Sequence, residues 1–83
     1  MSNFKKIKVY YYAFLREERG LSEEVVQTAA SSAQEFYIEL KEKYHFKLSL
    51  NLVKVALNDA FVDWETPLHD GDSVVFIPPV AGG

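Results

Sequence analysis

The side chains that most often carry out chemistry in proteins are few in this sequence and form no recognised pattern. It contains no cysteine, which excludes a disulfide framework, a thiolate metal site and a cysteine nucleophile. The two histidines, His45 and His69, lie far apart and match no metal-binding motif such as HExxH. Asp70 and Asp72 flank Gly71, a pattern typical of a turn rather than of an acid–base pair. These residues do not assemble a nucleophile, a base and an oxyanion site.

The end of the chain indicates a different kind of chemistry. The sequence finishes in Gly82 and Gly83, which follow Val80, Ala81 and a pair of prolines. Residues 78–83 span up to about 20 Å when extended, and glycine keeps the segment thin because it has no Cβ. Such a tail can enter a narrow channel and deliver its terminal carboxyl group there. A carboxylate is a poor electrophile, so another enzyme would have to activate it. The alternative interpretation is an ordinary frayed end.

Length and composition limit the classes of protein to which the chain can belong. With 83 residues, 48% of them hydrophobic and 25% charged, we expect one globular domain. The net charge of −3 argues against nucleic-acid binding. No apolar run approaches the length of a membrane span, so we expect no membrane partner. No secretory signal is apparent, and the absence of cysteine fits a reducing compartment; we therefore expect a cytoplasmic protein.

Acidic residues gather toward the end of the sequence. Basic residues outnumber acidic ones over residues 1–20, whereas Asp59, Asp63, Glu65, Asp70 and Asp72 lie close together later in the chain. The simpler interpretation is a solvated loop surface. The alternative is a patch that steers a basic protein partner.

Alternation of apolar and polar residues predicts five strands. The first covers residues 6–13, with Ile7, Val9 and Tyr11 on its core face. A charged turn over residues 16–20 would join it to the second strand as a hairpin. The further strands are predicted at residues 23–28, 52–57, 61–64 and 73–77. Asn58 and Asp59 suit a tight reversal between the third and fourth.

One main helix is predicted after the second strand. Ser32 and Glu35 form a capping box, in which each side chain is expected to bond the other residue's backbone amide. An apolar stripe follows at helical spacing, and the helix should end within residues 43–46. The stripe consists of Ala33, Phe36, Tyr37, Leu40 and Tyr44. The only tryptophan, Trp64, is expected to fill the core under a loop.

The order strand, strand, helix, strand, strand, strand predicts an α+β domain with a mixed sheet. This order resembles the β-grasp, or ubiquitin-like, roll, in which the first and last strands lie side by side in the middle of the sheet. We therefore expect a β-grasp domain over residues 1–77 and a flexible C-terminal tail over residues 78–83.

The last third of the chain resembles a known family. Residues 70–83 fill, without a gap, the pattern DGD-x-V-x-F-x-P-P-V-x-G-G of the small, sulfur-carrying subunit of molybdopterin synthase. Residues 12–17 resemble the family's F-A-x-x-R-E segment, with tyrosine in place of phenylalanine. The length and the order of elements also agree, so the resemblance covers nearly the whole chain.

The resemblance implies a sulfur-carrying cycle. An adenylating, E1-like activating enzyme uses ATP to adenylate Gly83, sulfur then replaces one oxygen, and the result is a thiocarboxylate. The loaded tail, with Gly82 as its slender neighbour, inserts into the large subunit of molybdopterin synthase within a heterotetramer. There it donates sulfur to a cyclic pterin precursor to form a dithiolene. The catalytic residues lie on the large subunit, and this chain itself binds no cofactor or metal.

The resemblance also implies an apolar partner surface around the last strand. The matching positions are Phe61, Ile77 and Tyr12, followed by the tail residues Pro78, Pro79 and Val80. Their ordinary interpretation is core packing. Arg16 is a further candidate for positioning the tail or a partner.

Three other functions remain open. A sulfur carrier for thiazole synthesis shares the fold and the terminal glycines, although its members tend to lack the Phe-x-Pro-Pro-Val segment. A ubiquitin-like modifier would be joined through Gly83 to lysines of target proteins. A noncovalent binding module would make no use of the tail.

Overall fold

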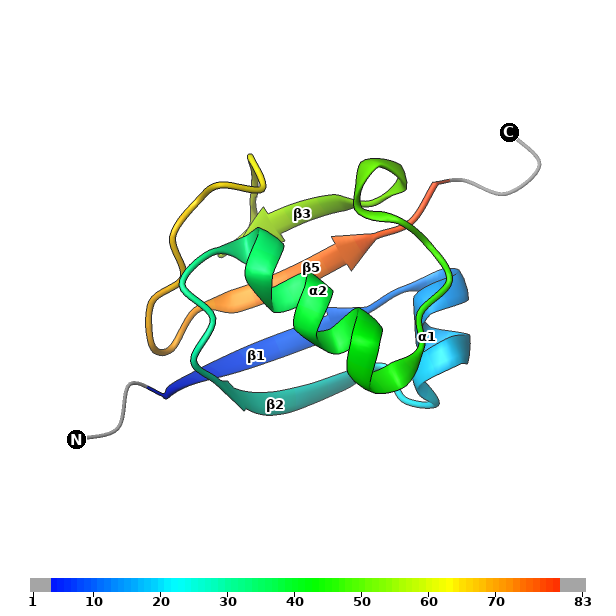
Figure 1. The fold of residues 1–83 in the computed structure, drawn as a ribbon, viewed down its shortest axis with the longest axis horizontal. Helices are drawn as coiled ribbons and strands as arrows, with labels where there is room; N and C mark the ends of the chain where they lie inside the picture. Colours follow the sequence, from blue (N-terminus) through cyan, green and yellow to red (C-terminus); the bar gives the residue numbers. More distant parts are fainter. Residues whose placement is uncertain (1–3, 80–83) are drawn as a thin grey trace.

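The computed structural model describes residues 4–79 of the 83, which fold into a five-stranded sheet with helices packed beside it (Figure 1). The elements follow one another as β1 (Lys5–Tyr11), α1 (Ala13–Arg19), β2 (Glu23–Thr28), α2 (Ala33–Tyr44), the 3₁₀ helix η1 (Leu50–Leu52), β3 (Lys54–Leu57), β4 (Ala60–Val62) and β5 (Ser73–Ile77). The predicted α+β fold is confirmed.

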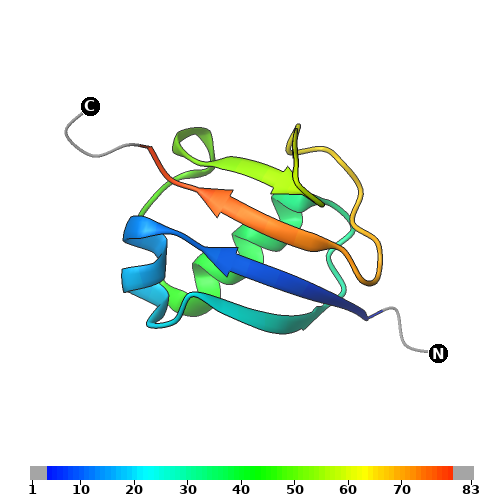
Figure 2. The same cartoon turned by 180° about the vertical axis from the view of Figure 1, so that it is seen from behind.

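The first and last strands lie at the centre of the sheet. The strand order is β2-β1-β5-β3-β4. β1 and β5 run parallel, whereas the other neighbours are antiparallel. α2 crosses one face of the sheet, and within residues 4–79 no helix covers the other face (Figure 2). We call this uncovered side the open face. The strand order confirms the expected central pairing of β1 with β5.

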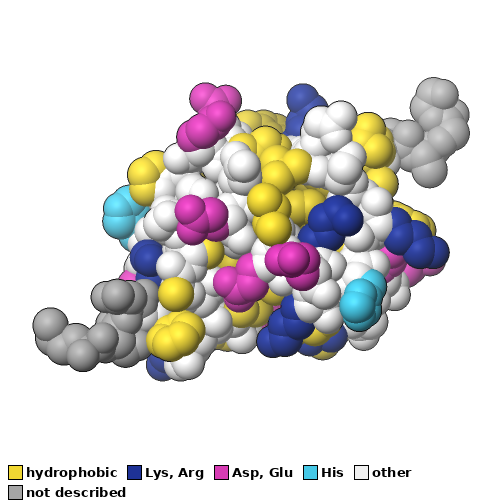
Figure 3. All heavy atoms as spheres, viewed as in Figure 1, with side chains coloured by type: hydrophobic (Ala, Val, Ile, Leu, Met, Phe, Trp, Pro, Cys, Tyr) yellow, Lys and Arg dark blue, Asp and Glu magenta, His cyan; other side chains and the backbone are white. Residues whose placement is uncertain are grey.

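The core lies between the sheet and α2. Ile7, Val9 and Tyr11 are buried as predicted, and β5 adds Val74 and Phe76. The stripe on α2 is buried at Ala33, Phe36, Tyr37 and Leu40, and Tyr44 packs against it while partly exposed. Charged side chains of both signs are scattered over the outer surface on this side (Figure 3). Hydrophobic burial against one helix thus stabilises the sheet on a single face.

Aromatic rings fill the middle of this core. The ring of Tyr37 lies 5.0 Å from that of Phe76, and Trp64 stacks on Phe76 at 6.1 Å. Trp64 therefore packs against the core, but it stays partly exposed rather than filling the core as expected. The hydroxyl group of Tyr37 donates a hydrogen bond to the Leu48 carbonyl at 2.8 Å. Burial, together with the charge of Glu18, raises the pKa of Tyr37 to about 12. The phenol therefore stays protonated at neutral pH and satisfies a carbonyl in the core.

The capping of α2 differs in one bond from the prediction. The hydroxyl oxygen of Ser32 accepts the Glu35 backbone N–H at 3.2 Å, as expected. The Glu35 carboxylate, however, accepts the backbone N–H of Ser31 rather than that of Ser32. The hydrogen bonds that the Glu35 carboxylate accepts from the backbone and side chain of Ser31 lower the pKa of Glu35. α2 ends at His45, whose left-handed φ of 60° closes the helix within the expected range.

β1 and β2 pair as antiparallel neighbours, as predicted, but the predicted turn between them is wrong, because α1 joins them. A positive φ of 50° at Ala13 ends the strand path after Tyr11. The following residues are good helix formers, and Leu15 anchors one turn in the core with no exposed surface. Gly20 closes α1 at φ 87°, where glycine is unstrained. The turn signal at Gly20 was present in the sequence, but it marks the end of a helix.

Two predicted strands also have different limits. β3 begins at Lys54 because Leu52 and Val53 donate backbone bonds to Ser49 and Leu50 in the turn of η1. β4 ends at Val62, after which the Thr66 N–H bonds the Asp63 carbonyl. The tight reversal is confirmed, since Asn58 and Asp59 have φ of 49° and 73°.

A partly buried ionic network fastens α1 to the sheet. Arg19 donates two hydrogen bonds to the Glu24 carboxylate, each at 2.8 Å. The Tyr11 hydroxyl donates to the same carboxylate at 2.6 Å, and the guanidinium lies 3.9 Å from the Tyr44 ring centre. Desolvation acts to raise the pKa of Glu24, but the bonds from Arg19 and Tyr11 outweigh it and lower the pKa. The ion pair of Arg19 and Glu24 therefore joins four elements, α1, α2, β1 and β2.

We predict that Glu24→Gln lowers the free energy of unfolding by about 2 kcal/mol at pH 7, because it removes hydrogen bonds to a charged, largely buried acceptor. The lowered folded-state pKa means that the ionised carboxylate stabilises the protein above its unfolded-state pKa. This stabilisation is lost as pH falls through the folded-state pKa. Urea unfolding at a series of pH values should show the two proteins converging in acid.

The control for this prediction is Glu23→Gln, which removes an exposed carboxylate 3.8 Å from Lys8. It should change the free energy of unfolding by no more than about 0.5 kcal/mol. A gap between wild type and Glu24→Gln that persists at the lowest pH at which both fold would contradict the ionic account.

Candidate functional site

The base of the tail continues directly from the central strand β5. The last sheet pairs before it are Tyr11 with Phe76 on one side and Lys54 with Ile77 on the other. Pro78 is then buried and Pro79 exposed. Proline cannot donate to a sheet ladder, so the strand stops here. The predicted site residues Val80, Gly82 and Gly83 lie outside the described residues.

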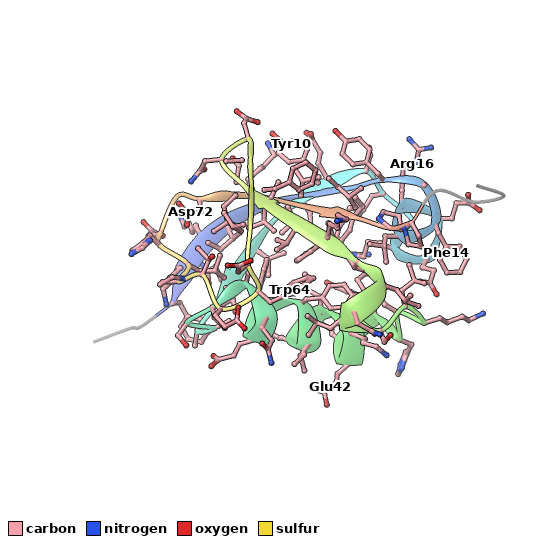
Figure 4. The ribbon with its side chains drawn as sticks, turned by 90° about the horizontal axis from the view of Figure 1, so that it is seen from above. Tyr10, Phe14, Arg16, Glu42, Trp64 and Asp72 are labelled. Carbon is pink, nitrogen blue, oxygen red and sulfur yellow. The ribbon has the colours of Figure 1, made fainter. Side chains whose placement is uncertain are left out.

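A row of side chains crosses the open face beside the tail's base. The register pairs Tyr10 with Val75, Val75 with Ala56, and Ala56 with Phe61. Four neighbouring strands thus place one residue each in a line, which we call the open-face row. Figure 4 shows Tyr10 projecting from the sheet on the side away from α2, whereas Glu42 projects from the outer side of that helix.

The predicted partner residues are exposed to different degrees. Phe61 is 69% exposed and Tyr12 is 52% exposed, whereas Ile77 is half-buried. Phe61 is exposed because it points to the open face at the end of the row, on the edge strand β4. An exposed phenylalanine next to half-buried apolar residues is the kind of surface that binds other proteins. A role in binding stays a prediction for all three.

Phe14, which was not among the predicted site residues, is 43% exposed on α1. Figure 4 shows Phe14 and Arg16 projecting from α1, and Figure 1 shows that α1 lies at the end of the molecule toward which β5 runs. The exposure of Phe14 could have been predicted only if residues 13–19 had been predicted to form a helix. Once residues 13–19 are helical, a buried Leu15 requires its neighbours Phe14 and Arg16 to face outward.

Asp70 and Asp72 belong to a turn, as predicted, and their carboxylates accept hydrogen bonds. Asp70 accepts the Lys6 backbone N–H at 2.7 Å. Asp72 accepts the His69 backbone N–H at 2.8 Å and the Asn58 amide group at 3.0 Å. These bonds hold the loop that leads into β5, and they occupy the carboxylates.

The part of the chain that the structure describes offers little for catalysis. Within residues 4–79, no group of three His, Asp or Glu side chains could hold a metal ion. His45 closes α2, and the His69 ring is an exposed neighbour of Asp72, with 4.0 Å between Nδ1 and Oδ2. Over the same residues, no helix is long and apolar enough to cross a membrane.

Two hollows border the open-face row. The larger, of about 970 Å³, lies beside β4 and is lined in part by Lys54, Phe61 and Trp64. The smaller, of about 330 Å³, lies over β5. It is lined by Tyr10, Tyr12, Asn58, Asp59, Ser73 and Val75. Both hollows therefore share at least one residue with the row.

A sequence model of the ThiS family matches residues 9–83, nearly the whole chain. The chain belongs to the ThiS family. It is 30% identical over 80 residues to a molybdopterin synthase sulfur carrier subunit of Escherichia coli, covering 93% of this chain and 99% of that one. It is 33% identical over 81 residues to the subunit of that name in Mycobacterium tuberculosis, covering 94% and 98%. The resemblance drawn from the tail and residues 12–17 is confirmed.

Solved structures agree with this family assignment. A putative molybdopterin converting factor subunit 1 from Pyrococcus furiosus superposes with a TM-score of 0.74 at 30% identity, covering 92% of this chain and 99% of that chain. A chain of the Helicobacter pylori complex of molybdopterin-converting factor subunits 1 and 2 gives a TM-score of 0.63 at 33% identity, covering 94% of this chain and 99% of that chain. The small archaeal modifier protein 1 of Methanosarcina acetivorans gives 0.76 at 22% identity, covering 96% and 98%, and shows the shared β-grasp fold.

We predict that Phe61→Ala changes the free energy of unfolding by no more than about 0.5 kcal/mol, because Phe61 is mostly exposed. Phe76→Ala is the matched comparison, since Phe76 is fully buried under Tyr37 and Trp64. It should cost about 3–5 kcal/mol. Urea unfolding of both variants measures the difference. A large loss of stability in Phe61→Ala would show that this side chain belongs to the core.

Proposed function

We propose that this ThiS family protein is the sulfur carrier of molybdopterin synthase and carries sulfur as a thiocarboxylate on Gly83. The match to relatives of that name over more than nine-tenths of the chain carries the proposal. The chemistry of the chain supports it, because no cysteine is available to hold sulfur as a persulfide. The terminal carboxyl group is then the only plausible place for the sulfur.

Loading requires two steps that this chain does not catalyse. A Gly83 carboxylate oxygen attacks the α-phosphorus of ATP on the activating enzyme, and pyrophosphate leaves. Hydrosulfide, supplied by a donor, then attacks the acyl carbon and displaces AMP, which carries away one of the original carboxylate oxygens. The product is the thiocarboxylate. When its sulfur passes to the pterin precursor, an oxygen from water restores the carboxylate.

The fold suits a carrier that other proteins hold by its body. β5 is paired on both sides at its end, so the base of the tail has a fixed position relative to the open face. A partner that binds the open-face row can thereby direct the tail into its own active site. The partner we propose is the large subunit of molybdopterin synthase, as in the Helicobacter pylori complex of two such subunits. The activating enzyme would use the same face at another stage.

The test of loading is intact-mass analysis after incubation with the activating enzyme, ATP and a sulfur donor. We predict a mass gain equal to one exchange of oxygen for sulfur, located by fragmentation on Gly83. A chain lacking Gly82 and Gly83 is the negative control and should gain nothing. An unchanged mass after incubation with the cognate activating enzyme, shown separately to be active, would refute the proposal.

A matched variant carries one alanine after Gly83. Its body is unaltered, so its unfolding curve should match that of the wild type. Pterin sulfuration should be abolished, because the added methyl group widens the tail and moves the carboxyl group away from the reacting position. Full activity of this variant would contradict delivery by the tail.

We further predict that Phe61→Asp weakens binding to the large subunit at least about tenfold, because it places a charge in the apolar part of the interface. Ile38→Asp is the control, since Ile38 is exposed on α2, on the other side of the molecule from the open face. It should change the dissociation constant by less than about threefold. Isothermal titration calorimetry measures both. Equal effects of the two variants would show that the open face is not the binding surface.

A ubiquitin-like modifier is the alternative that the fold also permits. The structure of the small archaeal modifier protein and that of Urm1 from Trypanosoma brucei share this fold at 22% and 20% identity. Conjugation would begin with the same adenylation and end in an isopeptide bond to a lysine. Mass spectrometry of cell extracts separates the two functions, since a modifier leaves Gly83 attached to lysines of other proteins.

A further inference from the structure

We infer that the smaller hollow on the open face is a seat for an arginine side chain of the protein partner. This inference rests on the proposed function in one respect, namely that the open face binds a protein. The hollow itself has three features that together define its occupant. They are two aromatic walls, a single carboxylate and a floor of small and apolar residues.

Asp59 is the only charged residue among those that line the hollow. Within residues 4–79, its carboxylate makes no hydrogen bond or ion pair with the rest of the chain. By contrast, the nearby Asp72 bonds to Asn58 and His69, and Asp70 bonds to Lys6. Asp59 is thus available to a ligand, and its negative charge would attract a cation.

Asp59 is held in place by the turn that carries it. The Asn58 side chain donates to Asp72 and accepts the Ser73 backbone N–H, each at 3.0 Å. The Asn58 backbone N–H also donates to the Ser73 carbonyl at 2.9 Å. These bonds tie the β3–β4 turn to the start of β5. A carboxylate on a fixed turn loses little conformational freedom when it binds.

Tyr10 and Tyr12 supply the aromatic walls. Neither hydroxyl group has a hydrogen-bond partner within the described residues, whereas the buried Tyr11 and Tyr37 hydroxyls both do. The faces of such rings attract cations. Lys8 already demonstrates this attraction, with its ammonium 5.6 Å from the Tyr10 ring centre.

Lys8 does not itself occupy the hollow. Its ammonium lies 3.8 Å from the Glu23 carboxylate on β2, and Lys8 is not a lining residue. The charge of Lys8 is therefore balanced by Glu23. Asp59 remains as the unbalanced charge of the hollow.

A guanidinium group fits this set of features better than an ammonium group. Its flat, weakly hydrated surface stacks on tyrosine while its N–H groups reach a carboxylate. The apolar stem of the side chain would lie along Val75, which belongs to the open-face row and forms part of the floor. The seat is thus continuous with the apolar surface that includes Phe61, two residues beyond Asp59.

The direct test titrates the full chain with ethylguanidinium chloride and follows backbone amide signals by NMR. Ethylurea, which has nearly the same shape without the charge, is the matched probe, and sodium chloride keeps the ionic strength constant. We expect ethylguanidinium to shift the amide signals of Tyr10, Asp59 and Val75 in a saturable manner. Asp59→Asn should weaken this binding about fivefold, whereas Asp63→Asn should leave it unchanged.

Asp63→Asn is a close control, because Asp63 is an exposed carboxylate just beyond β4 that does not line the hollow. Equal shifts with ethylurea, or equal binding by wild type and Asp59→Asn, would overturn the inference. This measurement involves neither the tail nor sulfur. Failure of the mass test would therefore refute the proposed function alone, and failure of the guanidinium test would refute the arginine seat alone.

The second arm uses the large subunit of molybdopterin synthase in calorimetry. Asp59→Asn and Tyr10→Leu should each weaken its binding about fivefold, whereas Asp63→Asn should change the dissociation constant by less than twofold, on the order of experimental scatter. Raising the salt concentration should reduce the difference between wild type and Asp59→Asn, because screening weakens the charge pair. Equal losses in Asp59→Asn and Asp63→Asn would indicate general attraction by negative charge and contradict a specific seat.

Discussion

The central position of β5 is the constraint on which the rest of the structure depends. This strand is hydrogen-bonded to β1 on one side and to β3 on the other up to its last residues. A parallel pair such as β1 and β5 needs a long connection, and nearly all of the domain lies between these two strands in the sequence. Because both sides of β5 are paired, the chain leaves the sheet from a rigid position. A partner that binds the domain can position the tail only if the base of the tail is fixed in this way.

The same arrangement makes the two faces of the sheet unequal. One main helix is enough to bury one face, and the aromatic cluster around Phe76 fills the space beneath it. The ionic network at Glu24 fastens α1 at the edge without covering the other face. The open face carries the row of Tyr10, Val75, Ala56 and Phe61. Stability is thus supplied on one side, and the other side is the surface that we propose for binding partners.

Several elements could be predicted because their signals are local. The alternation around Val9 and the periodic stripe around Phe36 each place a core face, and both residues are fully buried. The turn at Asn58 follows from side chains that tolerate a positive φ. The helix α1 could not be predicted in the same way. Its single buried residue, Leu15, gives no periodic stripe, so the charged residues around it resemble a turn.

What the sequence alone determined is which chemical groups the chain offers: it has no cysteine and no recognised catalytic pattern, and for this reason we propose the segment ending in Gly83 as the reactive part. Only the tertiary structure decided which surface accompanies that segment. Tyr10 and Asp59 are remote in sequence, and Val75 and Phe61 belong to different strands, yet strand register brings them to one face. Register depends on pairing between distant segments, where a shift of one residue would move every side chain to the opposite face. Local patterns indicate which residues of one strand share a face, but they do not indicate which residues of different strands lie side by side.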